Sequence, residues 1–148
     1  MTTITIIEEK INVLAQFLDC QIEEIEDQGD NRFSIGYHRS SEFLVLTEEE
    51  ADKAAREYIL DSLWAFKPSF ILDHMKSTPE GYEYEMLEKA ISRMQNDLCE
   101  SCNALVLALI YDIDLFIENA ISADGRGHFL GLYDGEENEE GNYLIYRL

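Results

Sequence analysis

The sequence predicts an α+β fold, with a helical core of four to five helices and short antiparallel β-hairpins near residues 32–46 and 128–147. Near both ends of the chain, apolar residues alternate with polar ones, as in half-buried strands. Between these ends, apolar residues recur every three or four positions, as in amphipathic helices. No repeat, linker or low-complexity segment interrupts the 148 residues, so we expect a single domain spanning residues 1–148.

The N-terminal third is expected to contain one helix and one hairpin. Helical spacing of apolar residues predicts the helix over residues 5–19. Its apolar positions are Ile7, Ile11, Leu14 and Leu18. Residues 21–27 are acidic and fit either a continuation of this helix or an edge strand. After a turn at residues 28–31, apolar residues alternate over 33–37 and 43–45, which predicts two strands joined by a short loop.

The clearest helix begins at Thr47. Thr47 and Glu50 have the spacing of a capping box, in which each side chain satisfies a backbone N–H of the other residue. The apolar face that follows is Ala51, Ala54, Ala55, Tyr58, Ile59, Ser62, Leu63 and Phe66. Leu60 and Trp64 lie off this face, where they either pack beneath the N-terminal hairpin or form an exposed anchor. Pro68 favours the first turn of a short helix.

Three more helices are expected in the second half of the chain. Pro79 opens one of them, and residues 102–110, which are apolar nearly all round, predict the central and most buried helix. The buried positions expected after Pro79 are Leu87, Ala90, Ile91, Met94 and Leu98. Asp112 or Asp114 is expected to cap a last helix, which Gly125 ends with a left-handed residue.

The charge of the chain restricts its partners. The 31 Asp and Glu residues outnumber the 11 Lys and Arg residues, for a formal net charge of -20. Direct binding to nucleic acid or to an anionic membrane is disfavoured, because both require Lys and Arg. The longest uncharged apolar run, residues 104–111, is too short to cross a membrane, and the N-terminus lacks the features of a signal peptide. We therefore expect a soluble, intracellular protein with a basic protein as partner.

Cys99 and Cys102 form a CxxC pair, which can be a redox pair or half of a zinc site. The third cysteine, Cys20, is distant in sequence and the histidines are scattered, so a complete zinc ligand set is not evident. The pair also lies inside an apolar, helical pattern. We interpret both residues as buried helical cysteines and expect no metal site.

The segment 124–128, with the sequence DGRGH, has two interpretations. Asp124, Arg126 and His128 could form an acid–base or phosphate-holding group on a glycine-hinged loop. Alternatively, both glycines adopt positive φ between a helix and a strand, and Arg126 pairs with a local carboxylate. No Ser or Cys nucleophile accompanies the histidine, which favours a structural or protein-binding role.

The second hairpin is expected to pair residues 128–133 with residues 143–147 across a long acidic loop. The loop has the composition of a calcium site, but its spacing does not fit an EF-hand, which has a Gly at its sixth position and a Glu at its twelfth. Counted from Asp134, Gly135 is at the second position and Ile145 is at the twelfth. We interpret the loop as solvated and able to contact a partner, with no cofactor or metal bound.

Acidic residues cluster at 23–27, 48–52, 80–88, 97–100 and 134–140. Carboxylates spaced along a rigid surface can take the place of DNA phosphates in a basic groove, although clustering at helix N-termini also follows from helix electrostatics. The residues expected to bind a partner are Asp52, Glu57, Asp61, Asp124, Arg126, His128, Asp134, Glu136, Glu137, Glu139 and Glu140.

Two pairs of motifs carry a resemblance to a known group. One pair is EFLVLTEEEAD at 42–52 with DSLWAF at 61–66. The other is AISADGRGHFL at 120–130 with YDGEE at 133–137, followed by Tyr146 and Arg147. Together they resemble a family of small acidic proteins encoded by bacteriophages and prophages. The resemblance implies a viral origin and brings no catalytic residues, and the CxxC pair is not part of it.

From these observations we expect a protein that acts in the host cell cytoplasm by binding. The first hypothesis is an inhibitor of a host anti-phage defence protein, as a DNA mimic or an anti-CRISPR protein, that covers a basic nucleic-acid-binding surface. The alternatives are a structural or accessory phage protein, or an enzyme that uses Asp124, Arg126 and His128. We expect no enzymatic activity, and the oligomeric state is left open.

Overall fold

The structure is a computed structural model that describes residues 3–36, 38–77 and 80–148. Its helices and its five-stranded antiparallel sheet confirm the α+β class. The contacts divide the chain into two compact units, the residues up to Ala55 with Asp124–Leu148, and Arg56–Ala123. The expectation of a single domain stays a prediction.

The first unit is built on one antiparallel sheet with the strand order β1-β2-β3-β5-β4. The strands are β1 (Ile25–Gly29), β2 (Arg32–Ile35), β3 (His38–Leu46), β4 (Asn138–Glu140) and β5 (Tyr143–Arg147). The two hairpins predicted from sequence are therefore parts of one sheet. They are joined by pairing of β3 with β5, in which Val45 lies opposite Ile145.

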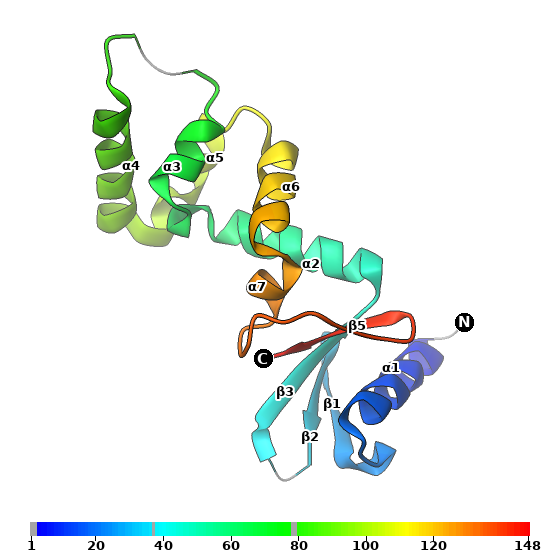
Figure 1. The fold of residues 1–148 in the computed structure, drawn as a ribbon. Coiled ribbons are helices and arrows are strands. Elements are labelled where there is room, and N and C mark those ends of the chain that lie inside the picture. Colours follow the sequence, from blue (N-terminus) through cyan, green and yellow to red (C-terminus); the bar gives the residue numbers. More distant parts are fainter. Residues whose placement is uncertain (1–2, 37, 78–79) are drawn as a thin grey trace. The chain divides into compact units, whose positions relative to one another are not determined.

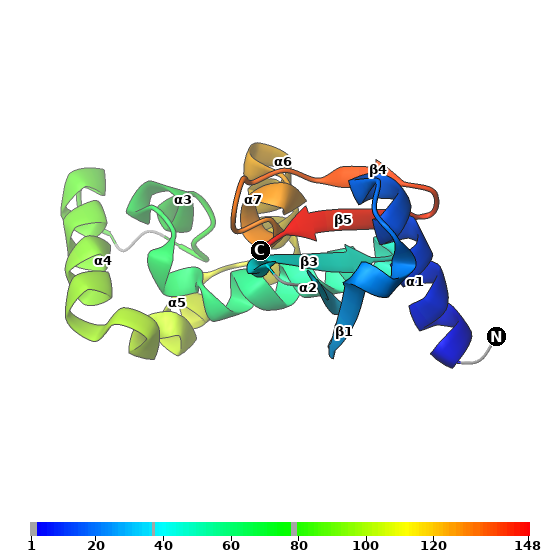
Figure 2. The same cartoon turned by 90° about the horizontal axis from the view of Figure 1, so that it is seen from below.

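The first unit's core lies between this sheet and helix α1 (Thr3–Leu18), as Figures 1 and 2 show. Alternate residues of the strands point to the helix, which gives the period of two seen in the sequence. The core residues are Leu14 and Ala15 from the helix with Ile25, Phe33, Phe43, Val45, Tyr143 and Ile145 from the sheet. The acidic stretch left open in the sequence forms a 3-10 turn (Ile22–Glu24) followed by the edge strand β1. Tyr37 lies outside the described residues.

One predicted strand of the first unit is wrong. Residues 128–133 were expected to be extended, but Arg126–Leu130 forms the short helix α7. The second hairpin lies in the predicted range, and its first strand is β4, joined to β5 by a turn at Gly141 and Asn142. In so short a segment, the apolar pattern of Phe129, Leu130 and Leu132 fits one helical face as well as a strand, so periodicity alone could not decide between them.

The second unit is helical. Its elements are the end of α2 (Glu48–Asp61), a 3-10 turn (Leu63–Ala65), α3 (Pro68–Asp73), α4 (Tyr84–Leu98), a 3-10 turn (Cys99–Cys102), α5 (Asn103–Leu109) and α6 (Ile113–Asp124). Pro68 occupies the first turn of α3, as predicted. The carboxylate of Asp112 accepts the N–H groups of Asp114 and Leu115 and so caps α6. Helix α4 begins at Tyr84 rather than at Pro79, which lies outside the described residues.

The prediction that residues 102–110 form the most buried helix is wrong. In α5 only Val106 is buried, while Leu105 and Leu107 are exposed. Burial depends on which elements cover a helix, and the buried apolar side chains of this unit come mainly from the surrounding helices, including α3 and α6. Cys102 is buried as expected, but Cys99 is exposed.

Leu60 and Trp64 are both partly buried in the second unit. The backbone N–H of Trp64 donates to Oδ1 of Asn103 at 2.8 Å, and Nδ2 of Asn103 donates to the carbonyl of Asp61 at 2.7 Å. One amide side chain thus ties the end of α2 and the turn after it to the start of α5. Among the described residues, no helix is both long and apolar enough to cross a membrane.

Candidate functional site

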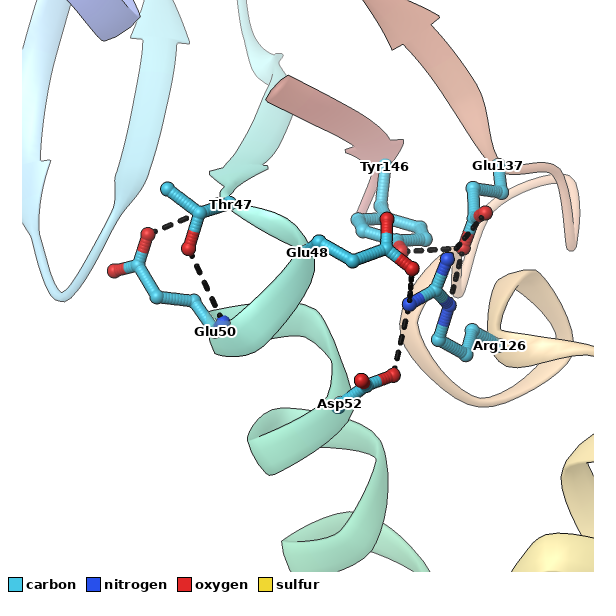
Figure 3. Close-up of polar contacts among 7 residues, drawn as sticks. All are labelled: Thr47, Glu48, Glu50, Asp52, Arg126, Glu137 and Tyr146. Carbon is cyan, nitrogen blue, oxygen red and sulfur yellow. Dashed lines mark hydrogen bonds and ion pairs between the residues drawn. The ribbon is translucent and has the colours of Figure 1, made fainter. Parts of the chain in front are cut away.

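The N-terminus of α2 is fixed by the predicted capping box. The backbone N–H of Glu50 donates to Oγ1 of Thr47 at 3.2 Å, and the backbone N–H of Thr47 donates to Oε1 of Glu50 at 3.0 Å (Figure 3). These bonds satisfy two backbone donors that the helix itself cannot pair. The first turn of α2, with its run of glutamates, therefore has a defined position beside the sheet.

A buried lysine reinforces this cap. Lys10 of α1 is 1% exposed, and its Nζ donates to Oε1 of Glu50 at 2.9 Å and to Oδ1 of Asn31 at 2.7 Å. Partial burial acts to raise the pKa of Glu50, but the hydrogen bonds from Lys10 and Thr47 outweigh it, so the pKa lies below its usual value. One carboxylate thus connects α1, the β1–β2 turn and α2.

A second ion-pair network lies on the same first turns of α2 and is centred on Arg126 (Figure 3). Nε and Nη2 of Arg126 donate to the two carboxylate oxygens of Glu137, both at 2.9 Å. Nη1 donates to Oε1 of Glu48 at 2.7 Å and to Oδ1 of Asp52 at 2.8 Å. Tyr146 of β5 donates its hydroxyl to Oε2 of Glu137 at 2.6 Å. We call Glu48, Asp52, Arg126, Glu137 and Tyr146 the Arg126 cluster.

The two glycines of the DGRGH segment place Arg126 in this cluster for different reasons. Gly125 has φ of +82°, a conformation that side chains disfavour, as predicted for the end of α6. The same prediction for Gly127 is wrong, because its φ is not positive and it lies within α7. A Cβ at Gly127 would overlap the carbonyl oxygen of Gly135. Gly127 is therefore required for close packing of α7 against the loop that carries Glu137.

The contacts of the Arg126 cluster shift the pKa of each titrating member. Burial acts to lower the pKa of Arg126, but its three carboxylate partners raise it further above the usual value. Partial burial acts to raise the pKa of Glu137, and the hydrogen bonds from Arg126 and Tyr146 outweigh this and lower it. Burial and the bond to Glu137 raise the pKa of Tyr146. All three shifts favour the protonation states that make these bonds.

Acid is expected to weaken the first unit through Glu137. Because its pKa is lower in the folded chain than the usual value of about 4.3, its contribution to stability is complete above that value and is lost as the pH falls through the folded pKa. Glu137→Gln should therefore flatten the dependence of the unfolding free energy on pH between about pH 5 and pH 3. Glu136→Gln, a change at the exposed neighbour, is the control. Urea unfolding followed by circular dichroism measures both, and equal slopes would contradict the assignment.

The Arg126 cluster combines a partly buried cation with more exposed carboxylates. The side chain of Arg126 is 14% exposed, whereas those of Glu48 and Asp52 are 68% and 66% exposed. Three carboxylates surround one guanidinium, so the cluster keeps a net negative charge. The structure thus brings together three of the predicted partner-binding residues, Asp52, Arg126 and Glu137.

The other predicted partner-binding residues lie outside this cluster. Asp124, His128, Glu136 and Glu139 are exposed in the first unit, and Glu140 is partly buried on β4. Asp134 is exposed, and its carboxylate accepts the backbone N–H of Glu136 at 3.0 Å, which shapes the loop. Glu57 and Asp61 are exposed on the part of α2 that belongs to the second unit.

The geometry gives little support to catalysis by Asp124, Arg126 and His128. The guanidinium of Arg126 is engaged by three carboxylates, which a phosphate would have to displace. The ring of His128 stacks edge-on against Phe129 at 5.0 Å between centroids. Within the described part of the chain, no three His, Cys, Asp or Glu side chains are grouped so that they could hold a metal ion.

Sequence reasoning missed several members of these networks. Glu48 belongs to an acidic run in the sequence, and its spacing of four residues from Asp52 places both on one helix face. Nothing in the sequence pairs Lys10 with Glu50 or Tyr146 with Glu137, because these partners are 40 and 9 residues apart and come from different elements. Comparison of the chain with known protein families, curated proteins and solved structures finds no match, so the site is interpreted from its own geometry.

Proposed function

We propose that this chain is an acidic inhibitory protein that covers a basic, nucleic-acid-binding surface of a host protein, in the manner of a DNA mimic or an anti-CRISPR protein. The observation that carries the proposal is the Arg126 cluster, in which a cation is used internally to fix carboxylates that face outward. A fixed array of carboxylates can replace phosphates without a large loss of side-chain entropy on binding.

The distribution of charge in the first unit supports this function. It holds nineteen of the 31 acidic residues but only six of the eleven basic ones. Lys10 is buried against Glu50, Arg126 is enclosed by its cluster, and the guanidinium of Arg147 lies over the ring of Tyr133 at 4.0 Å. These cations cross-link the fold, so the surface of the unit is more acidic than the composition alone implies.

The loop beside the Arg126 cluster also offers apolar contact area. Leu132 and Tyr133 are exposed, and Asp134, Glu136 and Glu137 follow them in the chain. The backbone N–H of Tyr133 donates to the carbonyl of Arg147 at 3.1 Å, which ties the loop to β5. Aromatic side chains such as Tyr are typical of the central contacts of protein interfaces, and charged side chains are typical of the rim around them.

The nature of the target follows from two expectations of the sequence. The resemblance to phage and prophage proteins implies a target in the bacterial host cytoplasm, where defence proteins bind DNA or RNA. The charge implies a basic surface on that target, reached by electrostatically steered association. A structural or accessory role in the phage would require no such target, and the experiment below distinguishes the two.

The proposal is tested by capturing host proteins on the purified chain at low and at high salt, followed by competition with double-stranded DNA. We expect a basic nucleic-acid-binding protein that is released by salt and displaced by DNA. The double variant Glu48→Gln with Asp52→Asn should bind this protein about 5- to 10-fold more weakly, because two exposed charge contacts of roughly 0.5 kcal/mol or more are lost. Both amides can still accept from Arg126, so the cluster keeps its shape.

A matched control removes the same charge elsewhere in the first unit. Glu8→Gln with Glu23→Gln changes two exposed carboxylates of α1 and the turn after it, and should alter binding less than about twofold. Equal weakening by the two double variants would show that only the total charge matters. Capture of no basic protein, or a complex that DNA cannot displace, would overturn the proposal.

A further inference from the structure

The second unit contains a pocket of about 300 Å³ that the acidic site does not use. It is lined by Asp73, His74, Met75, Lys76, Tyr111, Asp112 and Leu115. These residues come from the end of α3 and the segment after it, from the connection between α5 and α6, and from the start of α6, all within the unit Arg56–Ala123. A volume of this size lies at the lower limit of small-molecule sites and suits one large side chain rather than a cofactor.

Backbone bonds hold the two walls of the pocket together. Met75 and Ile110 form an isolated antiparallel bridge. The N–H of Tyr111 donates to the carbonyl of His74 at 2.8 Å, and the N–H of Lys76 donates to the carbonyl of Leu109 at 3.0 Å. The pocket is therefore formed before any ligand arrives, which lowers the entropic cost of binding.

His74 supports one wall and has no nitrogen available for a ligand. Its Nδ1 lies 2.8 Å from the carbonyl oxygen of Phe70, and its Nε2 lies 2.9 Å from Nδ2 of Asn119. The imidazole thus donates from Nδ1 and accepts at Nε2. Its ring packs against Phe70 and Phe116, with centroids 4.6 and 5.1 Å away. These contacts give His74 a packing role and argue against acid–base chemistry or metal binding in the pocket.

The rim of the pocket exposes apolar surface between acidic groups. Tyr111 is 76% exposed, more than any other large apolar side chain of the described residues, and Leu115 is 45% exposed. Asp73 and Asp112 line the same pocket, with Lys76 as the single Lys or Arg of the lining. An exposed aromatic and an exposed aliphatic side chain in a pocket lined by two aspartates complement a segment with an apolar side chain beside basic ones.

We propose that this pocket docks a segment of the basic partner in which one apolar side chain is flanked by Lys or Arg. The apolar side chain contacts Tyr111, Leu115 and Met75, and the flanking cations lie against Asp73 and Asp112. The inference rests on the proposed function in one respect, that the partner is basic. It adds a second contact surface, in the helical unit, whose contribution comes from apolar burial as well as from charge.

The test uses a short peptide and needs no identified partner. The acetylated and amidated tripeptide Lys-Phe-Lys is titrated into the isotope-labelled full chain at low salt, and amide chemical shifts are followed by nuclear magnetic resonance. We expect saturable shifts at residues 73–76 and 110–115. The peptide Lys-Ser-Lys should bind at least about tenfold more weakly because the apolar contact is absent, and Glu-Phe-Glu should also bind more weakly because it meets the acidic rim.

Variants of the chain locate the binding. Tyr111→Ser with Leu115→Ser should abolish the saturable shifts, whereas Tyr82→Ser, at an exposed tyrosine outside the pocket lining, should leave them unchanged.

The proposal would be overturned if Lys-Ser-Lys or Glu-Phe-Glu bound as tightly as Lys-Phe-Lys. Shifts of the same amides on dilution of the free chain would identify a second copy as occupant and would also overturn it. These results do not depend on the capture of a host protein, so failure here and failure of the proposed function are separate outcomes.

Discussion

Replacing Glu50 by alanine is expected to lower the free energy of unfolding by about 3–5 kcal/mol, because it leaves the ammonium of Lys10 buried without its partner. Lys10 is 1% exposed, and among the residues that the structure describes the Oδ1 of Asn31 would remain as its only hydrogen-bond acceptor. The variant also loses the bond from the backbone of Thr47, which contributes a smaller part. Urea unfolding followed by circular dichroism measures the change.

Two further variants separate the buried charge from a general effect of the first turn of α2. Glu49→Ala alters the exposed neighbour of Glu50 and should change the unfolding free energy by less than about 0.5 kcal/mol. Lys10→Met combined with Glu50→Gln leaves no buried charge, so it should recover most of the loss. A cost for Glu50→Ala no larger than that for Glu49→Ala would refute the role given to Lys10.

Gly127→Ala is expected to destabilise the first unit by about 3 kcal/mol, at the upper end of the usual cost of overpacking. The added methyl group would overlap the backbone of Gly135, Glu136 and Glu137, and backbone yields less readily than a flexible side chain. The loop must move away from α7, which separates Glu137 from Arg126. In this background, Glu137→Gln should therefore have less effect on stability than it has in the natural chain.

Gly135→Ala provides the comparison for this steric effect. Gly135 has φ of +73° and open space around the position of a Cβ, so its substitution should cost about 1 kcal/mol through backbone strain alone. Amide hydrogen exchange of the residues in β4 and β5 shows whether the loop has shifted. Similar costs and similar exchange for the two alanine variants would contradict close packing as the reason for Gly127.

The features predicted correctly from sequence are those in which a few consecutive residues interact. The two residues of the capping box, Thr47 and Glu50, are three positions apart, as are Asp112 and Leu115 in the cap of α6. The errors occur where a short pattern is compatible with two structures. The apolar pattern of residues 128–133 fits a strand or a helix equally well. The apolar run at 102–110 shows which side chains could be buried, but not which of them other elements of the fold cover.

Several residues of the candidate site could be predicted from the sequence, but the contacts among them could not. The sequence suggested that Arg126 pairs with a local carboxylate, and Glu137, eleven residues away, is such a partner. The other two partners, Glu48 and Asp52, lie 78 and 74 residues away from Arg126 in the sequence. They come close to it because β3, which leads into α2, pairs with β5. No local rule selects them from 31 acidic residues.

By itself the sequence determined the α+β class, the capped helix at Thr47, and a strongly acidic chain in which basic residues are scarce. Only the tertiary structure decided that both hairpins share one sheet, that Lys10 is buried, and that Arg126 orders three carboxylates. The physical reason is the sequence separation over which each interaction acts. Capping and periodicity act over about four residues, whereas burial and ion pairing depend on which distant segments the folded chain brings into contact.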